Sequence, residues 1–230
     1  MSKRPDPVAL LKQLSLEPLF KGLGAVGLRQ LAQAAVWREY AAGEVVFLEG
    51  ETAPGLYFLQ FGQLKIVMTS PEGREQVLLY LAPGEIFNPI GAFANLPNPA
   101  TAIALEPAGV WMLPRDMMVR LLREWPELAQ GVIANMASRL LHLTKLVEDL
   151  SLRSVSGRLA RMLLDSAKDD VLQRPRWYTQ AELAARLGTV PDMVGRALRR
   201  LVEHGYIEVE RHQFRILDPA GLQREVDAER

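Results

Sequence analysis

Short hydrophobic runs separated by glycines are the feature of this sequence that most restricts its fold. They extend from Ala41 to Leu113 and include Leu64–Met68 and Gln76–Tyr80. The glycines between the runs are Gly43, Gly50, Gly55, Gly62, Gly73 and Gly84. Strand-like runs with turn residues at roughly 8–12-residue spacing are typical of antiparallel all-β folds. The stretch therefore predicts an antiparallel β roll or barrel.

Helical patterns lie on both sides of this stretch. Leucine and alanine recur with helical spacing over residues 8–36, and helical spacing returns from Pro114 to Asp149. In the second helical stretch, one set of apolar residues follows intervals of 4, 3, 4 and 3, which is the heptad spacing of a coiled-coil seam. The seam residues are Met136, Leu140, Leu143, Val147 and Leu150.

The heptad seam needs a partner, and two partners are open. It can pack on the β roll of its own chain, or it can pair with the same helix of a second chain. Further apolar residues that can face the roll are Val132, Ile133, Leu141 and Leu146. Because these residues leave the seam available, the pattern favours a homodimer formed along this helix.

Two short helices joined by a glycine are predicted between residues 178 and 201. Thr179 followed by Glu182 forms a capping box, in which each side chain can bond the other residue's backbone amide. The first helix then ends at Gly188, a residue suited to the left-handed conformation that closes helices. The tight connection predicts a helix-turn-helix.

The second of these helices carries an exposed basic face. Thr189 followed by Asp192 repeats the capping pattern, and Pro191 suits the first turn because it has no amide proton to leave unsatisfied. The buried face is expected to comprise Val194, Ala197, Leu198 and Leu201. The side chains that then point outward are Asp192, Met193, Arg196, Arg199, Arg200 and Glu203.

Arginines give this region a local excess of positive charge. The whole chain is neutral, with 27 Lys and Arg against 27 Asp and Glu. Between Arg174 and Arg200, however, there are six arginines against two acids. The planar guanidinium group pairs bidentately with guanine or with phosphate. A helix-turn-helix whose second helix enters the DNA major groove explains this arrangement.

Two alternating runs, Gly205–Glu210 and Gln213–Leu217, follow the two helices. They flank Arg211 and His212 and predict a β hairpin. Without this hairpin, an ordinary helical hairpin with solvated arginines explains the two helices equally well. Because a hairpin in this place is typical of a winged helix, the sequence favours a DNA-binding winged helix-turn-helix.

These features together resemble the CRP/FNR superfamily of bacterial transcription regulators, named for the cyclic-AMP receptor protein and the fumarate–nitrate reduction regulator. Besides the roll and the long helix, the resemblance rests on Pro83–Phe87, Val155–Ala160 and Val194–Arg196. It implies a homodimer that senses a signal in its N-terminal roll and binds a near-palindromic promoter site on double-stranded DNA, with RNA polymerase as a further partner. Half-sites about 34 Å apart are expected for such a dimer.

The expected fold class is α+β, organised in three parts. Residues 1–125 form a β-roll sensor domain with flanking helices, 126–152 a dimerisation helix and hinge, and 153–230 the winged helix-turn-helix domain. The hinge is expected near the small polar stretch 151–157. The N-terminus has no continuous apolar region, and no segment approaches the ~18 consecutive apolar residues of a membrane span. We therefore expect a cytoplasmic protein with no membrane partner.

The resemblance also implies roles for residues of the second helix. Arg196 is similar to the guanine-contacting arginine of the family, and Asp192 replaces its recognition glutamate, where it can accept from a cytosine amino group or orient Arg196. Pro191 replaces a base-contacting arginine of the cyclic-AMP receptor protein, so the operator sequence cannot be transferred. The expected DNA contacts are Thr179, Gln180, Thr189, Asp192, Met193, Arg196, Arg199 and Arg200. Phosphate contacts are expected from Thr179, Gln180, Thr189 and Arg199 or Arg200.

The cyclic nucleotide site of the family lacks its charged residues here. Asn88-Pro89 stands where the family has Gly-Glu, and Asn98-Pro99-Ala100 stands where it has Arg-Ser-Ala. Without the glutamate for the ribose and the arginine for the phosphate, we expect no cyclic nucleotide to bind. Either a small, weakly polar effector binds or the dimer binds DNA without an effector, and the second is slightly favoured. The candidate pocket residues are Asn88, Ile90, Phe93, Asn98, Leu143, Thr144 and Val147.

Cysteine and histidine usage excludes several kinds of site. The chain has no cysteine, which excludes disulfides, thiolate zinc sites, iron–sulfur clusters and cysteine nucleophiles. His142, His204 and His212 lie outside the β roll, so no haem ligand or cupin metal site is expected there. With no catalytic constellation discernible, we expect no metal, no cofactor and no enzymatic activity. The alternative to a DNA-binding regulator is a ligand-sensing regulatory module that acts through protein contacts.

Overall fold

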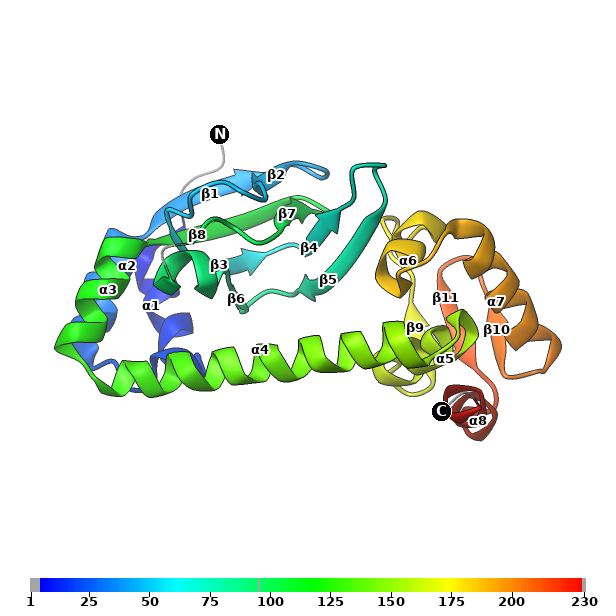
Figure 1. Cartoon of the computed structure of the whole chain (residues 1–230). Coiled ribbons are helices and arrows are strands. Elements are labelled where there is room, and N and C mark those ends of the chain that lie inside the picture. The colour runs from blue at the N-terminus through cyan, green and yellow to red at the C-terminus, as the bar shows by residue number, and fades with distance from the viewer. Residues whose placement is uncertain (1–4, 95, 229–230) are drawn as a thin grey trace. The chain divides into compact units, whose positions relative to one another are not determined.

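The computed structural model describes residues 5–94 and 96–228, which fall into two units (Figure 1). The first unit contains the described residues up to Met68 together with Leu79–His142. The second contains Thr69–Leu78 together with the residues from Leu143 onward. Residues 1–4, which belong to the N-terminal segment without a continuous apolar region, lie outside the described part. The division falls inside the long helix, and the three domain ranges expected from the sequence stay a prediction.

The first unit begins and ends with helices and has strands between them, which confirms the expected α+β class. Its elements, of which β4, β5 and α4 extend into the second unit, are α1 (Pro7–Leu16), η1 (Pro18–Phe20), α2 (Ala25–Ala34), β1 (Val36–Tyr40), β2 (Val45–Phe47), β3 (Gly55–Phe61), β4 (Leu64–Thr69), β5 (Glu75–Leu81), β6 (Ile86–Phe87), η2 (Ile90–Ala94), β7 (Thr101–Ala104), β8 (Ala108–Pro114), α3 (Arg115–Glu124) and α4 (Glu127–Leu152).

The strands form the antiparallel roll that the glycine-punctuated pattern predicts. They build two four-stranded sheets, ordered β1-β8-β3-β6 and β2-β7-β4-β5. The pairs β1–β8, β3–β8 and β4–β7 are antiparallel. Gly62, in the turn from β3 to β4, has a φ of 87°, and a Cβ atom there would lie 2.6 Å from the Pro107 carbonyl oxygen. Only glycine fits that turn without strain.

β3 is buried on both faces, which explains why its hydrophobic residues run continuously instead of alternating. Leu56 and Phe58 pack in a core with residues of the helices, including Leu31 of α2. Tyr57 and Leu59 point to the opposite face and pack between the two sheets. A strand covered on both sides needs apolar residues at every position.

Tyr57 makes the stability of this core sensitive to high pH. Its ring stacks on Phe87 with the centroids 5.2 Å apart, and burial raises the pKa of Tyr57 to about 12. In the unfolded chain the pKa is about 10, so the folded state is favoured fully below pH 10 and loses this contribution as the pH rises towards 12. We expect the loss of unfolding free energy between pH 9 and pH 11 to be smaller in Tyr57→Phe than in the wild type, as measured by urea denaturation. An equal loss in both proteins would contradict this role.

The second unit contains the C-terminal end of α4 and seven further elements. These are α5 (Val155–Ser166), β9 (Val171–Gln173), α6 (Gln180–Leu187), α7 (Pro191–Glu203), β10 (Ile207–Val209), β11 (Gln213–Ile216) and α8 (Pro219–Asp227). β10 and β11 pair antiparallel, with Ile207 opposite Ile216, which confirms the predicted hairpin. β9 pairs with the other edge of β11 and completes a three-stranded sheet.

The small polar stretch 151–157, expected to be a hinge, is short, and hydrogen bonds and an ion pair fix it to neighbouring elements of the second unit. α4 ends at Leu152, and Ser154 caps α5 by accepting a hydrogen bond from the Gly157 amide at 3.1 Å. Between them, the buried Arg153 pairs with Asp149 at 2.9 Å and donates to the Val226 carbonyl of α8 at 2.6 Å. These contacts join the end of α4 to α5 and α8.

Candidate nucleic-acid interface

α6 and α7 form the predicted helix-turn-helix. The Thr179 hydroxyl accepts a hydrogen bond from the Glu182 amide at 3.1 Å and so caps α6. Gly188 ends this helix in the left-handed conformation, with a φ of 62°. The Thr189 amide donates to the Ala184 carbonyl at 2.9 Å, which closes the turn. Local capping chemistry therefore sets both ends of α6.

The capping box predicted at Thr189 and Asp192 is wrong. The residue that precedes α7 is Val190, and no side chain caps the helix there. The physical reason is that the Thr189 amide belongs to the turn that ends α6, so Thr189 lies one residue too early to cap α7. Pro191 is the first residue of the helix, as expected.

α7 presents the predicted outward face. Its buried residues are Val194, Ala197, Leu198 and Leu201, as the helical periodicity indicates. The exposed residues of the predicted interface are Thr179, Gln180, Asp192, Met193, Arg196, Arg199 and Arg200, while Thr189 is half-buried. The structure therefore brings all eight predicted DNA contacts onto two consecutive helices and their turn.

Arg196 and Asp192 form an ion pair on this face. The Arg196 Nη2 atom lies 2.7 Å from Asp192 Oδ2, one helical turn away, and both side chains are exposed. Two exposed charges one turn apart contribute little to stability. The geometry is the one expected if Asp192 orients the guanidinium group for an external partner.

Three of the six arginines between Arg174 and Arg200 make contacts inside the second unit. The Arg174 guanidinium lies over the Phe214 ring, 4.6 Å from its centroid. Arg186 donates to the Tyr178 hydroxyl at 2.7 Å, and burial raises the pKa of Tyr178, so the phenol remains protonated. The third arginine pairs with a residue of α8.

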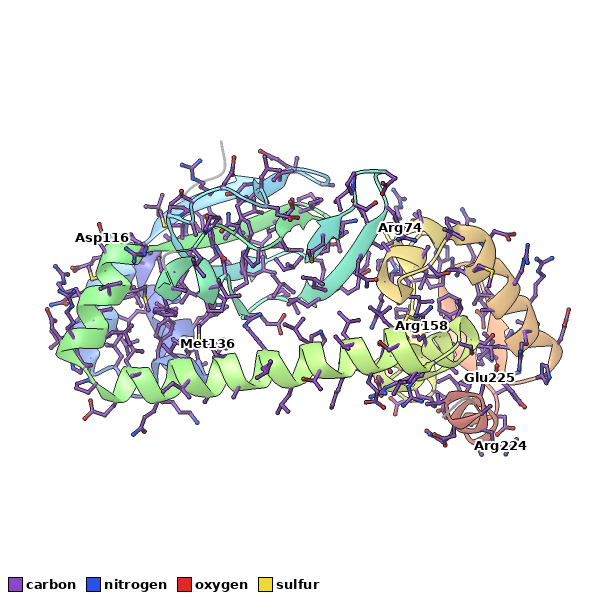
Figure 2. The ribbon with its side chains drawn as sticks, in the orientation of Figure 1. Arg74, Asp116, Met136, Arg158, Arg224 and Glu225 are labelled. Carbon is purple, nitrogen blue, oxygen red and sulfur yellow. The ribbon has the colours of Figure 1, made fainter. Side chains whose placement is uncertain are left out.

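That third arginine is Arg200, whose Nε atom lies 3.1 Å from the mostly buried carboxylate of Glu225, the residue labelled in Figure 2. Arg199, its neighbour, only approaches the Gly195 carbonyl, at 3.4 Å, and points into solvent. Within the described part of the chain, Arg176 and Arg199 form no ion pair. Fewer than six of the arginines in this region are therefore available to contact an external partner.

The predicted heptad seam of α4 is largely exposed in the single chain. Met136 (Figure 2) packs against the core of the first unit, but Val147 is 61% exposed and Leu140 and Leu143 are also exposed. Val132 is buried in a core that contains residues of the strands and of the neighbouring helices. Ile133 and Leu141 do not face the roll, because each is 65% exposed. They lie on the outer side of the helix, so the apolar stripe is wider than the seam alone.

The candidate effector residues are brought together only in part. The Asn88 amide donates to Asn98 Oδ1 at 2.9 Å, and Asn98 donates to the Leu48 carbonyl at 3.1 Å. Both asparagines are buried, and Asn88 adopts a left-handed φ of 63°. Phe93 packs against the core while Ile90 is exposed. The α4 residues Leu143, Thr144 and Val147 belong to the second unit, and the complete pocket stays a prediction.

Arg139 is a residue of the first unit that the sequence patterns did not single out. Its guanidinium donates to the Ile86 carbonyl and, at 3.1 Å, to Asn135 Oδ1. Burial lowers the pKa of Arg139, and the nearby Glu85 carboxylate partly offsets that effect. An arginine inside a helical pattern is indistinguishable from an ordinary surface residue, so no signal in the sequence identifies it.

No group of three or more metal-ligating side chains lies together in residues 5–94 and 96–228. Among the helices of this part, none is both long and apolar enough to cross a lipid bilayer.

Known families match both units. A profile described as "Cyclic nucleotide-binding domain" matches residues 37–124, and one described as "Crp-like helix-turn-helix domain" matches residues 157–225. Over 210 residues the chain is 30% identical to a protein of Lacticaseibacillus casei described as "Probable transcriptional regulator flp", covering 90% of this chain and 94% of that protein. The chain belongs to the CRP/FNR superfamily.

Other relatives agree with this membership. The chain is 29% identical to the cyclic AMP receptor protein of Thermus thermophilus over 194 residues, which cover 84% of this chain and 88% of that one. The structure of FixK2 from Bradyrhizobium japonicum matches with a TM-score of 0.72 over 83% of this chain and 96% of that chain, at 20% identity, which shows a common fold. CRP/FNR proteins are transcription regulators and not enzymes, and this chain carries their DNA-binding domain.

Proposed function

We propose that the protein is a homodimeric transcription regulator that binds a specific, near-palindromic DNA site through α7. The observation that carries the proposal is the outward face of α7, where Arg196 and Asp192 form an exposed ion pair at 2.7 Å. Arg196 contacts a guanine through its two terminal nitrogens, and Asp192 orients it or accepts from a cytosine amino group. RNA polymerase is the expected partner on the promoter.

Dimerisation follows from the exposed stripe on α4. Val147, Ile133 and Leu141 are each more than half exposed, and an apolar stripe along a long helix is stable only when another surface covers it. The same helix of a second chain supplies a matching stripe, which is the arrangement of a symmetric dimer. Two copies of α7 then contact two half-sites about one turn of DNA apart.

The first unit does not fit a cyclic nucleotide, although the Thermus relative is named as a cyclic AMP receptor. A cyclic phosphate needs a cationic or amide-rich cradle with free donors. Asn88 and Asn98 occupy the corresponding positions, but neither carries a charge, and each amide nitrogen already donates one of its two hydrogens, Asn88 to Asn98 Oδ1 and Asn98 to the Leu48 carbonyl. We therefore propose that DNA binding by this protein needs no cyclic nucleotide.

The salt dependence of DNA affinity, measured in variants of Arg199 and Arg200, tests the proposed interface. Arg199→Ala removes an exposed cation, so the slope of log affinity against log salt should become shallower by about one unit per half-site. Arg200→Ala is the matched control, because Arg200 is engaged by Glu225. It should lower the free energy of unfolding by about 1–3 kcal/mol and leave the slope nearly unchanged. Fluorescence anisotropy with a labelled promoter duplex measures the slope, and equal slopes in wild type and Arg199→Ala would count against this interface.

The variant Gly195→Ala is a second test, because we expect it to have a higher free energy of unfolding and a weaker affinity for DNA. Gly195 lies inside α7, and a Cβ atom there would meet no atom of the described residues within 4 Å. Gly195→Ala should therefore raise the free energy of unfolding by about 0.5–1 kcal/mol. We expect DNA affinity to fall several-fold, because glycine allows the DNA backbone to approach the helix closely. Tighter or unchanged DNA binding in this variant would show that no such approach occurs.

A further inference from the structure

Val190 and Met193 are exposed apolar side chains at the N-terminal end of α7, on either side of the exposed Pro191. Val190 is 46% exposed and Met193 is 37% exposed, and the Met193 amide donates to the Val190 carbonyl at 3.1 Å, so both lie on one turn. We call this pair the apolar edge. Met193 also precedes Arg196 by three residues, which places the two side chains next to each other on the helix surface.

Val190 departs from local preference in two ways at once. The residue before a helix is usually Ser, Thr, Asp or Asn, whose side chain accepts from a free backbone amide. The other helices that begin in the second unit follow this rule, with Ser154 before α5, Thr179 before α6 and Asp218 before α8. At α7 a valine takes this place, which forgoes the capping bond and exposes an apolar side chain. A residue that departs from the local sequence preference and does not stabilise the fold is expected at a functional site.

We infer that the apolar edge contacts the 5-methyl group of a thymine next to the base pair that Arg196 contacts. In the major groove, the thymine methyl is the only apolar group on a base edge, and apolar side chains recognise it by direct contact. The apolar edge lies beside the Arg196–Asp192 pair and on the same helix as the exposed Arg199, and the positive charges of the two arginines complement DNA. The inference rests on the proposed function and adds a specified base to the operator.

The thymine methyl can be removed without changing base pairing, because deoxyuridine differs from thymidine only by that group. The full-length protein first selects duplexes from a pool with a randomised window. Each thymine of the selected site is then replaced by deoxyuridine, one symmetry-related pair at a time, and affinity is measured by fluorescence anisotropy. At the thymine beside the Arg196-dependent guanine we expect the affinity to fall about fourfold per half-site, hence about 15-fold for both.

Protein variants show whether the apolar edge is the group that contacts this methyl. In Val190→Ala or Met193→Ala the deoxyuridine penalty should disappear, because the contact is already lost. Val202→Ala is the matched control, since Val202 is 44% exposed at the other end of α7. It should retain the full penalty. Thermal unfolding followed by circular dichroism verifies that all three variants remain folded.

The results separate failure of this inference from failure of the proposed function. If no thymine of the selected site shows a deoxyuridine penalty, or if the penalty persists in both Val190→Ala and Met193→Ala, the inference is overturned while DNA binding stands. If the wild-type protein selects no sequence from the pool, the proposed function itself fails.

Discussion

Replacing Arg196 by alanine is expected to weaken binding to the specific DNA site by about 1–3 kcal/mol per half-site, roughly 5–150-fold, while binding to random duplex changes much less. The reason is that a bidentate contact with guanine distinguishes one base pair from the others, whereas phosphate contacts do not. Arg196 is exposed and, among the described residues, forms an ion pair only with Asp192, so the fold should tolerate the change. Competition between specific and random duplexes in an anisotropy assay measures the selective loss.

Two variants sharpen the interpretation of this result. Arg196→Lys keeps the charge but loses the planar fork, so it should restore binding to random DNA and not specificity. Asp192→Asn removes the carboxylate that holds Arg196, and a smaller loss of specificity is expected. If Arg196→Ala weakens binding to specific and random duplexes by the same factor, Arg196 contacts phosphate and not a base.

Replacing Phe214 by alanine is expected to lower the free energy of unfolding of the second unit by about 3–5 kcal/mol. The Phe214 side chain is fully buried in the central strand β11, between Val209 of β10 and Leu172 of β9. Its ring also supports the Arg174 guanidinium at 4.6 Å. The substitution leaves a cavity under the wing and removes this cation–π contact.

Urea denaturation followed by circular dichroism measures the effect of Phe214→Ala. The chain contains two units with separate cores, so a change confined to one transition is expected. Phe214→Leu serves as the matched control and should cost much less, because most of the buried volume is kept. A loss below about 1 kcal/mol in Phe214→Ala would show that the wing does not depend on this residue.

The helix-turn-helix could be predicted because its signals are local. Thr179 and Glu182 are three residues apart, and Gly188 adopts its left-handed conformation for reasons internal to the turn. The same kind of reasoning gave a wrong prediction at Thr189. This residue lies between α6 and α7, and its amide bonds the Ala184 carbonyl in the turn that ends α6. Local sequence rules therefore predict a helix end correctly only where the backbone groups at that end belong to one helix alone.

Elements stabilised by distant contacts could not be predicted. α8 has a local start signal in Asp218 and Pro219, which the sequence analysis did not single out, but its apolar face consists of Leu222 and Val226, whose burial depends on packing within the second unit. The ion pair between Arg200 and Glu225 joins residues that no short pattern relates. For the same reason, the sequence showed a basic region but not how many of its arginines are engaged inside the domain.

The central claim is sequence-specific binding by a dimer, and one titration tests it most directly. The protein is titrated against a duplex obtained by selection, against the same duplex with one half-site scrambled, and against random duplex, each at several salt concentrations and without added nucleotide. The account predicts an affinity for the intact site at least about 10³-fold above that for random DNA, a large loss when one half-site is scrambled, and affinities that fall steeply with salt. Equal affinities for the three duplexes, or specific binding that appears only when cyclic nucleotide is added, would contradict it.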